Sequence, residues 1–416
     1  MKTQCCIAGG GPAGMMLGYM LSEAGIDVTV LEKWPDFFRD FRGDTIHPST
    51  MENLAELGIL EDFLALKHEE VPQMTGVVGS RRIVLADFST LKMRCPFISF
   101  VPQWDFLNLL RDKAQNNTKF RLLMNTAVTD VIEKDGKVSG VRAKSGDQQI
   151  DISCDLVIGA DGRSSTVREK AGLTVQSIGA PMDVLWFRLT RKDTDPSEPA
   201  GRFGAGRIVV LIYRENYWQC GFVIKKDSLE QLKLRGLDSF RRELIELAPF
   251  LSDRVNEITD LDELKLLSVR VDRLRKWYKP GLICIGDAAH AMSPVGGIGI
   301  NLAIQDAVAA ANVLVPAFRR GQIMLSDLAA IQNRRQLPTV MTQAVQVFLQ
   351  NRLINRVLSA KGSLRLNSIL STFNRFTFLR RLPALFIGKG FRSEHVTYQK
   401  AGPLELNAPG SAGFTN

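Results

Sequence analysis

Apolar residues follow two patterns along this chain, continuous runs and alternating runs. Continuous runs occur at residues 5–8, 156–160 and 282–285, and each is followed by glycine or by an acidic residue paired with glycine. Strands buried on both faces of a parallel sheet need such runs. Alternating apolar and polar residues occur within 71–100 and 180–270 and predict antiparallel strands. The pattern therefore predicts an α/β protein with a parallel sheet and an interleaved antiparallel sheet.

Turn signals and helical periodicity predict further elements along the chain. Helices are expected at residues 48–57, 106–114, 237–247, 300–318 and 326–358. Ser49 or Thr50 could cap the first of them. Other strands are expected at 120–123, 127–133, 138–143, 184–189, 207–213 and 217–224. The Asp-Gly pair at 135–136 predicts a hairpin between two of these strands.

The first 32 residues carry the most specific motif. An apolar run leads into Gly9, Gly11 and Gly14, then a helix-like stretch, then a β-branched strand that ends at Glu32. In such a β-α-β unit the glycines allow a tight turn, a close approach to a pyrophosphate, and close packing of helix on strand. The helix N-terminus favours phosphate, and Glu32 can accept hydrogen bonds from ribose hydroxyls. These residues predict a dinucleotide site.

Composition and charge exclude several other classes of protein. The chain has 416 residues and a net charge of +9, from 53 basic and 44 acidic residues, without a nucleic-acid-binding motif. Its 6 cysteines lack metal-binding spacing, so no metal site is expected. The glycine turn interrupts any leader, and no apolar run is expected to span a bilayer. We therefore expect a cytoplasmic protein with a basic surface.

Two later strand ends extend the predicted site. One ends at residues 161–162, Asp-Gly, and the other at 286–287, Gly-Asp, which leads through a glycine-rich loop at 294–297 to a helix that starts near 299–301. A carboxylate such as Asp287 can hold a ribose or ribityl hydroxyl, which implies a cofactor longer than NAD. The glycines let backbone lie against a flat ring, and a helix N-terminus stabilises the anionic locus of reduced flavin.

The three motifs, in this order, resemble the single-component (group A) FAD-dependent aromatic hydroxylases, of which p-hydroxybenzoate hydroxylase is the prototype. The resemblance covers roughly residues 1–318. It implies a Rossmann-like FAD-binding domain, an interleaved antiparallel-sheet substrate domain, and a C-terminal helical region. The expected boundaries are 1–70, 101–180 and 270–320 for the first, 71–100 and 181–269 for the second, and 321–416 for the third.

The resemblance also implies which residues bind the cofactor. Arg42 and Gln103 match family positions on the FAD side of the site, although a surface arginine and a helix-start residue explain them too. Asp161 and Gly162 match a fingerprint linked to both FAD and NAD(P)H. The residues expected to contact FAD are Gly9, Gly11, Pro12, Ala13, Gly14, Glu32, Lys33, Arg42, Gln103, Val128, Asp161, Gly162, Gly286, Asp287, Pro294, Gly297, Gly299, Ile300 and Asn301.

By the same resemblance, NAD(P)H reduces FAD, and a flavin C4a-hydroperoxide hydroxylates an aromatic or quinol-like small molecule. No second dinucleotide motif follows, so NAD(P)H is expected to visit the site transiently. Pro294, Gly296 and Gly297 are expected to form the oxygen-side wall of the catalytic site, whereas His290 is expected to be structural, without an acid nearby in sequence. The alternative is an FAD reductase or dehydrogenase of this fold that acts on a prenyl or lipid-like substrate without oxygen insertion.

Two features leave alternatives open. Trp186, Arg188, Tyr213 and Trp218 are substrate-contact candidates by residue type alone, and each also fits the core or the surface. The segment 367–391 mixes apolar and basic residues. It is expected to form a helical cap, and peripheral contact with a membrane is the alternative. The sequence predicts no oligomeric state.

Overall fold

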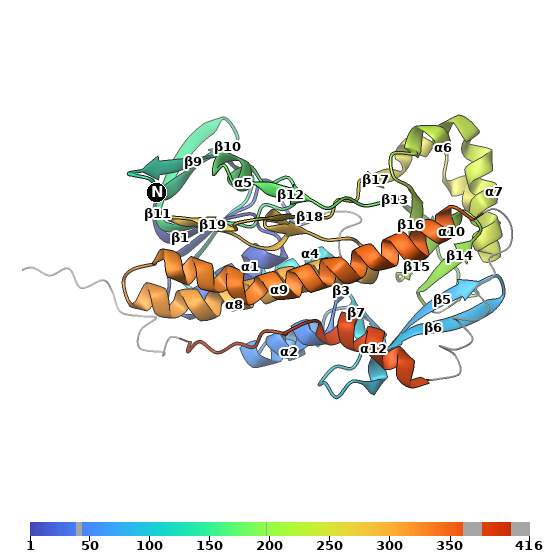
Figure 1. The fold of residues 1–416 in the computed structure, drawn as a ribbon, viewed down its shortest axis with the longest axis horizontal. Coiled ribbons are helices and arrows are strands. Elements are labelled where there is room, and N and C mark those ends of the chain that lie inside the picture. Colours follow the sequence, from blue (N-terminus) through green and yellow to red (C-terminus); the bar gives the residue numbers. More distant parts are fainter. Residues whose placement is uncertain (39–43, 197, 361–376, 401–416) are drawn as a thin grey trace, which may run out of the picture.

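The computed structural model describes residues 1–38, 44–196, 198–360 and 377–400. Figure 1 shows one large sheet at the end that holds the N-terminus, a second sheet at the other end, and the long helix α9 (Leu325–Leu349) running across both. The mixed α/β architecture with a helical C-terminal region is confirmed. The exact domain boundaries stay a prediction.

The first sheet has eight strands, ordered β19-β20-β11-β1-β2-β8, with β10 added beside β11 and β9 beside β10. They are β1 (Lys2–Ala8), β2 (Val28–Leu31), β8 (Phe120–Leu123), β9 (Thr126–Lys134), β10 (Lys137–Ser145), β11 (Gln148–Gly159), β19 (Tyr278–Lys279) and β20 (Leu282–Cys284). β1 pairs in parallel with β2 and β11, and β11 pairs in parallel with β20. The three continuous apolar runs are therefore neighbouring parallel strands, as predicted.

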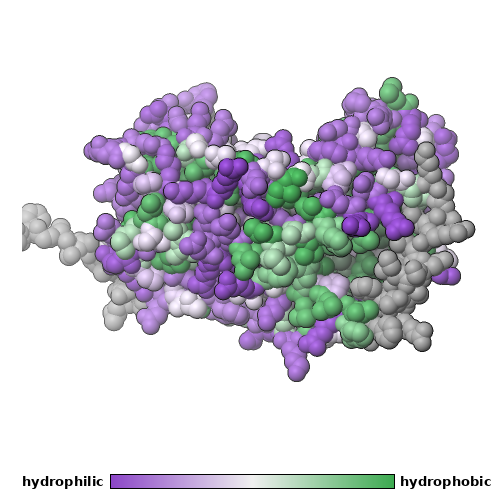
Figure 2. Space-filling model, viewed as in Figure 1, coloured by the Kyte–Doolittle hydropathy of each residue, from purple (hydrophilic) through white to green (hydrophobic). Residues whose placement is uncertain are grey.

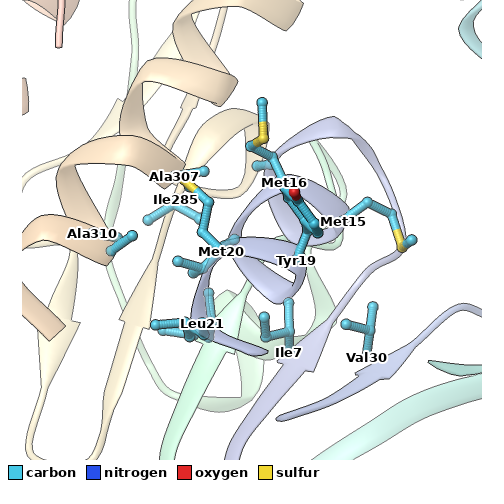
Figure 3. Packing of buried hydrophobic residues seen from close by; sticks show 14 of the residues in the cluster. Ile7, Met15, Met16, Tyr19, Met20, Leu21, Val30, Ile285, Ala307 and Ala310 are labelled. Carbon is cyan, nitrogen blue, oxygen red and sulfur yellow. The ribbon is translucent and has the colours of Figure 1, made fainter. Parts of the chain in front are cut away.

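Helices α1 (Pro12–Glu23), α4 (Gln103–Gln115) and α8 (Ile298–Arg319) pack with this sheet. α1 is apolar nearly all round, so it is buried between the sheet and α8. Figure 3 shows the side chains that join them, which are Ile7, Met15, Met16, Tyr19, Met20, Leu21, Val30, Ile285, Ala307 and Ala310. This packing fixes the start of α1, and with it the glycine turn, against the end of β1.

The second sheet is ordered β17-β13-β16-β15-β14-β5-β6. Its strands are β5 (Gln73–Val78), β6 (Arg81–Asp87), β13 (Met182–Thr190), β14 (Ala200–Gly204), β15 (Arg207–Tyr213), β16 (Tyr217–Lys225) and β17 (Lys265–Leu267). Alternate residues such as Leu185 and Phe187 pack against Phe240 and Leu244 of α7 (Leu237–Leu247). Because side chains alternate along a strand, the residues between them form the opposite face of the sheet.

Smaller elements complete the described chain. Two three-stranded sheets contain β3 (Thr45–Ile46), β4 (Glu69–Val71) and β7 (Ile98–Phe100), and β12 (Val175–Ser177), β18 (Asp272–Leu274) and β21 (His290–Ala291). The remaining α-helices before α9 are α2 (Pro48–Leu57), α3 (Leu60–Leu64), α5 (Thr166–Lys170) and α6 (Leu229–Arg235). Capping of α2 by Ser49 or Thr50 was a wrong prediction, because both lie inside the helix after the N-cap residue His47.

The C-terminal helices differ in part from the predicted continuous helix at 326–358. α9 continues into a π-helical turn, η7 (Gln350–Ile354), and then α10 (Asn355–Leu358). Of the segment 367–391, residues 367–376 lie outside the described residues. The described part holds η8 (Thr377–Arg380), α12 (Arg381–Ala384) and η9 (Leu385–Lys389). Ala384 packs with Phe88 and Leu91 near β6, so this part covers the protein as a cap.

One helical span among the described residues, Val295–Arg319, is long and apolar enough to cross a membrane. This corrects the expectation that no apolar run has that length. The span contains α8, and 83% of its most apolar window is buried inside the molecule. A core helix meets the same criteria, and the contacts of α8 with α1 and α9 identify it as one.

His47 makes the fold sensitive to acid. Its side chain is fully buried, its Nδ1 lies 2.8 Å from the Ile387 carbonyl oxygen, and burial lowers its pKa to about 4. The unfolded chain takes up a proton near pH 6.5 and the folded chain does so only near 4. Stability from neutral His47 is therefore complete above pH 6.5 and declines as the pH falls towards 4, by at most about 3 kcal/mol. In denaturant titrations at several pH values, His47→Gln should flatten this decline, and a decline as steep as that of the wild type would contradict the assignment.

Candidate active site

A cavity of about 700 Å³ lies between the carboxyl ends of strands in the first sheet and one face of the second sheet. At the first sheet it is lined by residues that follow β1, β2 and β11, including Gly9, Glu32 and Asp161. Ligands of open parallel sheets bind at this edge, where neighbouring strands lead into different connections. The cavity therefore brings the three sequence motifs to one site.

The glycine turn is built by close backbone contacts at two positions. Gly9 has φ of +107°, and a Cβ atom there would lie 2.3 Å from the Ala160 carbonyl oxygen. A Cβ atom on Gly14 would lie 1.9 Å from the Gly9 oxygen, so this glycine lets α1 meet the strand. Gly11 differs, because its Cβ atom would meet nothing within 4 Å. The space beside Gly11 is free for a ligand.

Carboxylates stand at three of the strand ends. Glu32 accepts hydrogen bonds from the Gly10 and Trp34 N–H groups, at 2.9 and 3.1 Å. Asp161 accepts from the Val167 N–H at 3.1 Å, so its carboxylate also caps α5. Burial raises the pKa of Asp161, although its hydrogen bonds with Ser165 and with backbone N–H groups such as that of Val167 lower it. Asp287 is partly exposed and pairs with Arg163 at 3.2 Å. Asp287 is thus the more accessible of the two later acids.

The glycine-rich loop forms a wall of the cavity before α8. Gly296 and Gly297 have φ of +80° and +63°, a conformation that favours glycine. A Cβ atom on Gly297 would lie 2.3 Å from Thr45 Oγ1. From the other side, Gln346 of α9 accepts from the Ser293 N–H at 3.2 Å and donates to the Val295 oxygen at 2.9 Å. The loop is therefore held on both sides, with its backbone toward the cavity.

The face of the second sheet that lines the cavity is apolar. Trp186 pairs in register with Gly221, and a Cβ atom on Gly221 would lie 3.0 Å from the indole. Phe203 lies in the same way over Gly201, whose Cβ atom would lie 3.1 Å from the ring. Small residues thus let two aromatic rings lie close to the sheet. The second-sheet residues that line the cavity are Met74, Thr75, Leu85, Met182, Val184, Trp186, Ala200, Gly201, Phe203, Ile208, Val210, Leu211, Ile212, Gly221, Val223 and Leu267.

A buried ion pair joins the two sides of the cavity. Arg214, which follows β15, donates to Asp44 Oδ2 at 2.5 Å, and their side chains are 7% and 6% exposed. Gln219 Oε1 lies 3.4 Å from the same guanidinium. Burial raises the pKa of Asp44, although Arg214 and Gln219 lower it. This contact fixes the second sheet to the loop that enters β3.

Most residues expected to bind the cofactor line this cavity. They are Gly9, Gly11, Pro12, Ala13, Glu32, Lys33, Gln103, Val128, Asp161, Gly162, Asp287, Pro294, Gly297, Gly299 and Ile300, and Gly296, expected in the oxygen-side wall, lines it too. Gly14, Gly286 and Asn301 do not line it, because they support its walls. Asn301, for example, accepts from the His47 N–H at 2.8 Å. Arg42 lies outside the described residues.

Of the four substrate-contact candidates, Trp186 alone lines the cavity. Trp218 lies on the opposite face of the sheet, where its Nε1 donates to Asp195 at 2.8 Å. Tyr213 packs edge to face against Trp218, and the Arg188 guanidinium lies 4.7 Å from the centre of the Tyr217 ring. Residue type alone did not show which of these side chains faces the cavity. The alternation of side chains along the paired strands places Trp186 and Trp218 on opposite faces of the sheet.

A buried polar network behind the site was missed. His290 Nε2 lies 2.5 Å from Asp306 Oδ2, and Arg335 Nε donates to the other oxygen at 2.9 Å. Asp306 also accepts from the Gly286 N–H at 3.0 Å, at the start of the third motif. The acid partner of His290 is sixteen residues away, on α8, so it is near in space and not in sequence. His290 is structural here, as expected, and does not line the cavity.

The cavity fits FAD. It extends from Glu32 past the open space at Gly11 to the loop at 294–297. The N-terminus of α1 lies at the glycine turn, where it favours a pyrophosphate, and the N-terminus of α8 lies at the glycine-rich loop. The site thus offers separate places for an adenosine half, a phosphate bridge and a flat ring.

Comparison with known proteins agrees with this geometry. Residues 2–344 match the family model described as "FAD binding domain". 6-Methylpretetramide 4-monooxygenase of Streptomyces rimosus is 33% identical over 85% of this chain and 84% of its own length. Pentachlorophenol 4-monooxygenase of Sphingobium chlorophenolicum is 27% identical over 72% of this chain and 56% of its own length. The chain thus spans little more than half of the length of some relatives.

Solved structures show the same fold. p-Nitrophenol 4-monooxygenase of Pseudomonas putida has a TM-score of 0.77 at 20% identity, over 94% of this chain and 99% of that one. A probable FAD-dependent monooxygenase of Pseudomonas aeruginosa has a TM-score of 0.72 at 21% identity, over 86% and 97%. The family match establishes the cofactor as FAD. The chain belongs to the group A FAD-dependent monooxygenases, the aromatic hydroxylase family, and is an FAD-dependent oxidoreductase.

Proposed function

We propose that this enzyme uses NAD(P)H and O2 to hydroxylate a neutral, largely apolar aromatic molecule with several rings. The observation that carries the proposal is the face of the second sheet. Among the described cavity-lining residues of that sheet, none is charged, and Trp186 and Phe203 present aromatic rings. A charged substrate would lose its hydration there without gaining a partner, whereas a flat ring system would gain stacking and apolar contact.

The relatives support this class of substrate. By their names, 6-methylpretetramide 4-monooxygenase and anhydrotetracycline monooxygenase of Streptomyces rimosus act on multi-ring compounds. Pentachlorophenol 4-monooxygenase, by its name, acts on a single ring. 6-Methylpretetramide 4-monooxygenase is also the relative that is 33% identical to this chain. Several rings suit the apolar face better than one, because each added ring adds contact area.

The residues at the polar end of the cavity would hold FAD. Glu32 would accept hydrogen bonds from ribose hydroxyls, the N-terminus of α1 would face the pyrophosphate, and Asp287 would hold the linker. The backbone of residues 294–297 would form the wall next to the flavin ring. Bound FAD, reduced by NAD(P)H, would supply the chemistry that activates O2, so that one oxygen atom enters the substrate and the other leaves as water. The protein's contribution is to orient the substrate ring and exclude water.

A ligand panel tests the proposal. Neutral phenols with three or four fused rings should stimulate NAD(P)H oxidation, measured by absorbance, whereas single-ring phenols that carry a carboxylate should not. The opposite order would contradict the proposed substrate class. If every multi-ring ligand were reduced and none gained oxygen, the reductase alternative would replace the proposal.

The aromatic platform at Trp186 gives a sharper expectation. Trp186→Ala should weaken binding of a multi-ring ligand by roughly fivefold or more, because stacking contributes about 1 kcal/mol beyond the buried area. Trp186→Phe should restore most of it. Gly221→Ala should also weaken binding, because the new methyl group would displace the indole. Titration of the flavin absorbance spectrum measures each affinity, and an unchanged affinity in Trp186→Ala would contradict the platform.

A further inference from the structure

The positive charge of this protein is concentrated in its C-terminal region. Residues 328–393 contain 11 of the 53 basic residues and no Asp or Glu, which leaves 42 basic against 44 acidic residues elsewhere. The net charge of +9 is therefore carried by this segment. Segregation of charge of this kind indicates an anionic partner more strongly than a uniformly basic surface does.

α9 presents apolar side chains outward. Its buried side carries Gln332, Gln343 and Gln346, which bind backbone groups of neighbouring loops. Leu337 and Phe348 on the other side are 50% and 61% exposed. After Ile331, α9 therefore has polar residues on its buried side and apolar residues among its exposed ones, unlike the usual surface helix, whereas Leu328 and Ile331 at its start are buried in the core. The buried glutamines do not explain why the outward side is apolar.

The exposed surface continues beyond α9. Leu353 of η7 is 47% exposed beside Arg352 and Arg356, which are also exposed. Leu382 of α12 is 63% exposed beside Arg381. Figure 2 shows apolar surface over α9 and over α12 on one face of the molecule, which is the face seen in Figure 1. Apolar and basic side chains therefore occur together on this face.

We propose that this face, formed by α9, η7, α10 and α12, docks on an anionic lipid bilayer. Basic groups near an anionic membrane are attracted to the headgroups, and exposed Leu, Met and Phe side chains enter the boundary between headgroups and acyl chains. A second copy of the chain fits less well, because a two-fold interface would oppose these basic residues to themselves. Nucleic acid would match the charge but not the exposed aliphatic side chains.

The docking face adjoins the cavity. Ile354 of η7 lines the cavity, while Leu353, the preceding residue, is exposed on the docking face. Ile387, after α12, lies near the glycine-rich loop, where a Cβ atom on Gly296 would be 3.6 Å from it. η7, which would touch the bilayer, thus also lines the site, and an apolar substrate could enter the cavity from lipid close to its binding place.

Flotation of the FAD-loaded full chain with vesicles tests the proposal. Binding is expected to vesicles of phosphatidylcholine with phosphatidylglycerol, to be far weaker with phosphatidylcholine alone, and to decline at high salt. The triple variant Arg352→Glu, Arg356→Glu, Arg381→Glu should lose binding by at least roughly a hundredfold, since each lost positive charge contributes about fivefold and the new carboxylates are repelled. Phe348→Ser should weaken binding without abolishing the dependence on anionic lipid.

A matched variant reverses three exposed charges at the other end of the molecule, Arg121→Glu, Lys134→Glu and Lys137→Glu, and should bind like the wild type. Equal loss in both triple variants would overturn the proposal, because net charge alone would then explain binding. Absence of wild-type binding at low salt would also overturn it. The proposal would also be overturned if the wild-type chain did not bind vesicles and light scattering instead detected a dimer that Phe348→Ser dissociates. None of these results depends on turnover, so the proposed function is tested separately.

Discussion

Asp306→Ala is expected to lower the free energy of unfolding by about 3–5 kcal/mol. Asp306 is fully buried and binds His290, Arg335 and the Gly286 N–H at once. Burial raises its pKa, but the charges and hydrogen bonds of His290 and Arg335 bring the pKa below its ordinary value. Removal of the carboxylate would leave the Arg335 guanidinium, which is 1% exposed, without its central partner. Denaturant titration measures the loss.

The control for this variant is a surface ion pair. Asp151 pairs with Arg142 at 3.0 Å, and both side chains are well exposed. Asp151→Ala should therefore leave the midpoint of unfolding close to that of the wild type. A wild-type midpoint in Asp306→Ala would contradict the role assigned to the buried network. Loss of FAD at full stability would instead place Asp306 in the cofactor site, which it does not line.

Gly14→Ala is expected to destabilise the FAD-bound fold strongly. The added methyl group would lie 1.9 Å from the Gly9 carbonyl oxygen, so α1 would have to move away from β1 and its buried side chains would lose their contacts. Overpacking of this kind typically costs 1–3 kcal/mol, occasionally more, and a clash with backbone lies at the high end of that range. The thermal midpoint and the FAD released on heating measure the outcome. A variant with normal stability and bound FAD would contradict the close approach.

Gly11→Ala separates folding from cofactor binding. Its methyl group would meet no protein atom within 4 Å, and Gly11 lines the cavity. We therefore expect the apoprotein to fold as the wild type does, while the dissociation constant for FAD rises at least tenfold, because the methyl group occupies the place proposed for the pyrophosphate. Fluorescence titration of the apoprotein with FAD measures this. Unchanged affinity would show that the pyrophosphate does not pass beside Gly11.

Elements with clear start and stop residues were predictable from the sequence. α2 (Pro48–Leu57) has the predicted bounds, because Pro48 starts it and Gly58, with φ of +76°, ends it. α7 and β15 also have the predicted bounds. Asp135 and Gly136 both have positive φ and form the predicted hairpin turn. Local backbone preference decides these features, so no distant contact is needed to find them.

Features that depend on distant partners were not predictable. The sequence does not show that Asp306 is the partner of His290, because the two side chains meet only through the packing of α8 behind the glycine-rich loop. Apolar residues normally mark the buried side of a surface helix, but Leu337, Met341 and Phe348 of α9 are exposed. The glutamines at 332, 343, 346 and 350 fall on one side of the helix and were the available signal. The absence of acidic residues from 328–393 was another signal, and it was overlooked.

Oxygen transfer is the most direct test of the proposed reaction. The FAD-loaded enzyme should be given NADH or NADPH, isotopically labelled O2, and the neutral multi-ring phenol that best stimulates NAD(P)H oxidation. Mass spectrometry should find one labelled oxygen atom in each product molecule, with product formed in proportion to NAD(P)H consumed. Unlabelled or oxygen-free product, with NAD(P)H consumption matched by hydrogen peroxide or by reduced substrate, would contradict the proposed monooxygenase reaction.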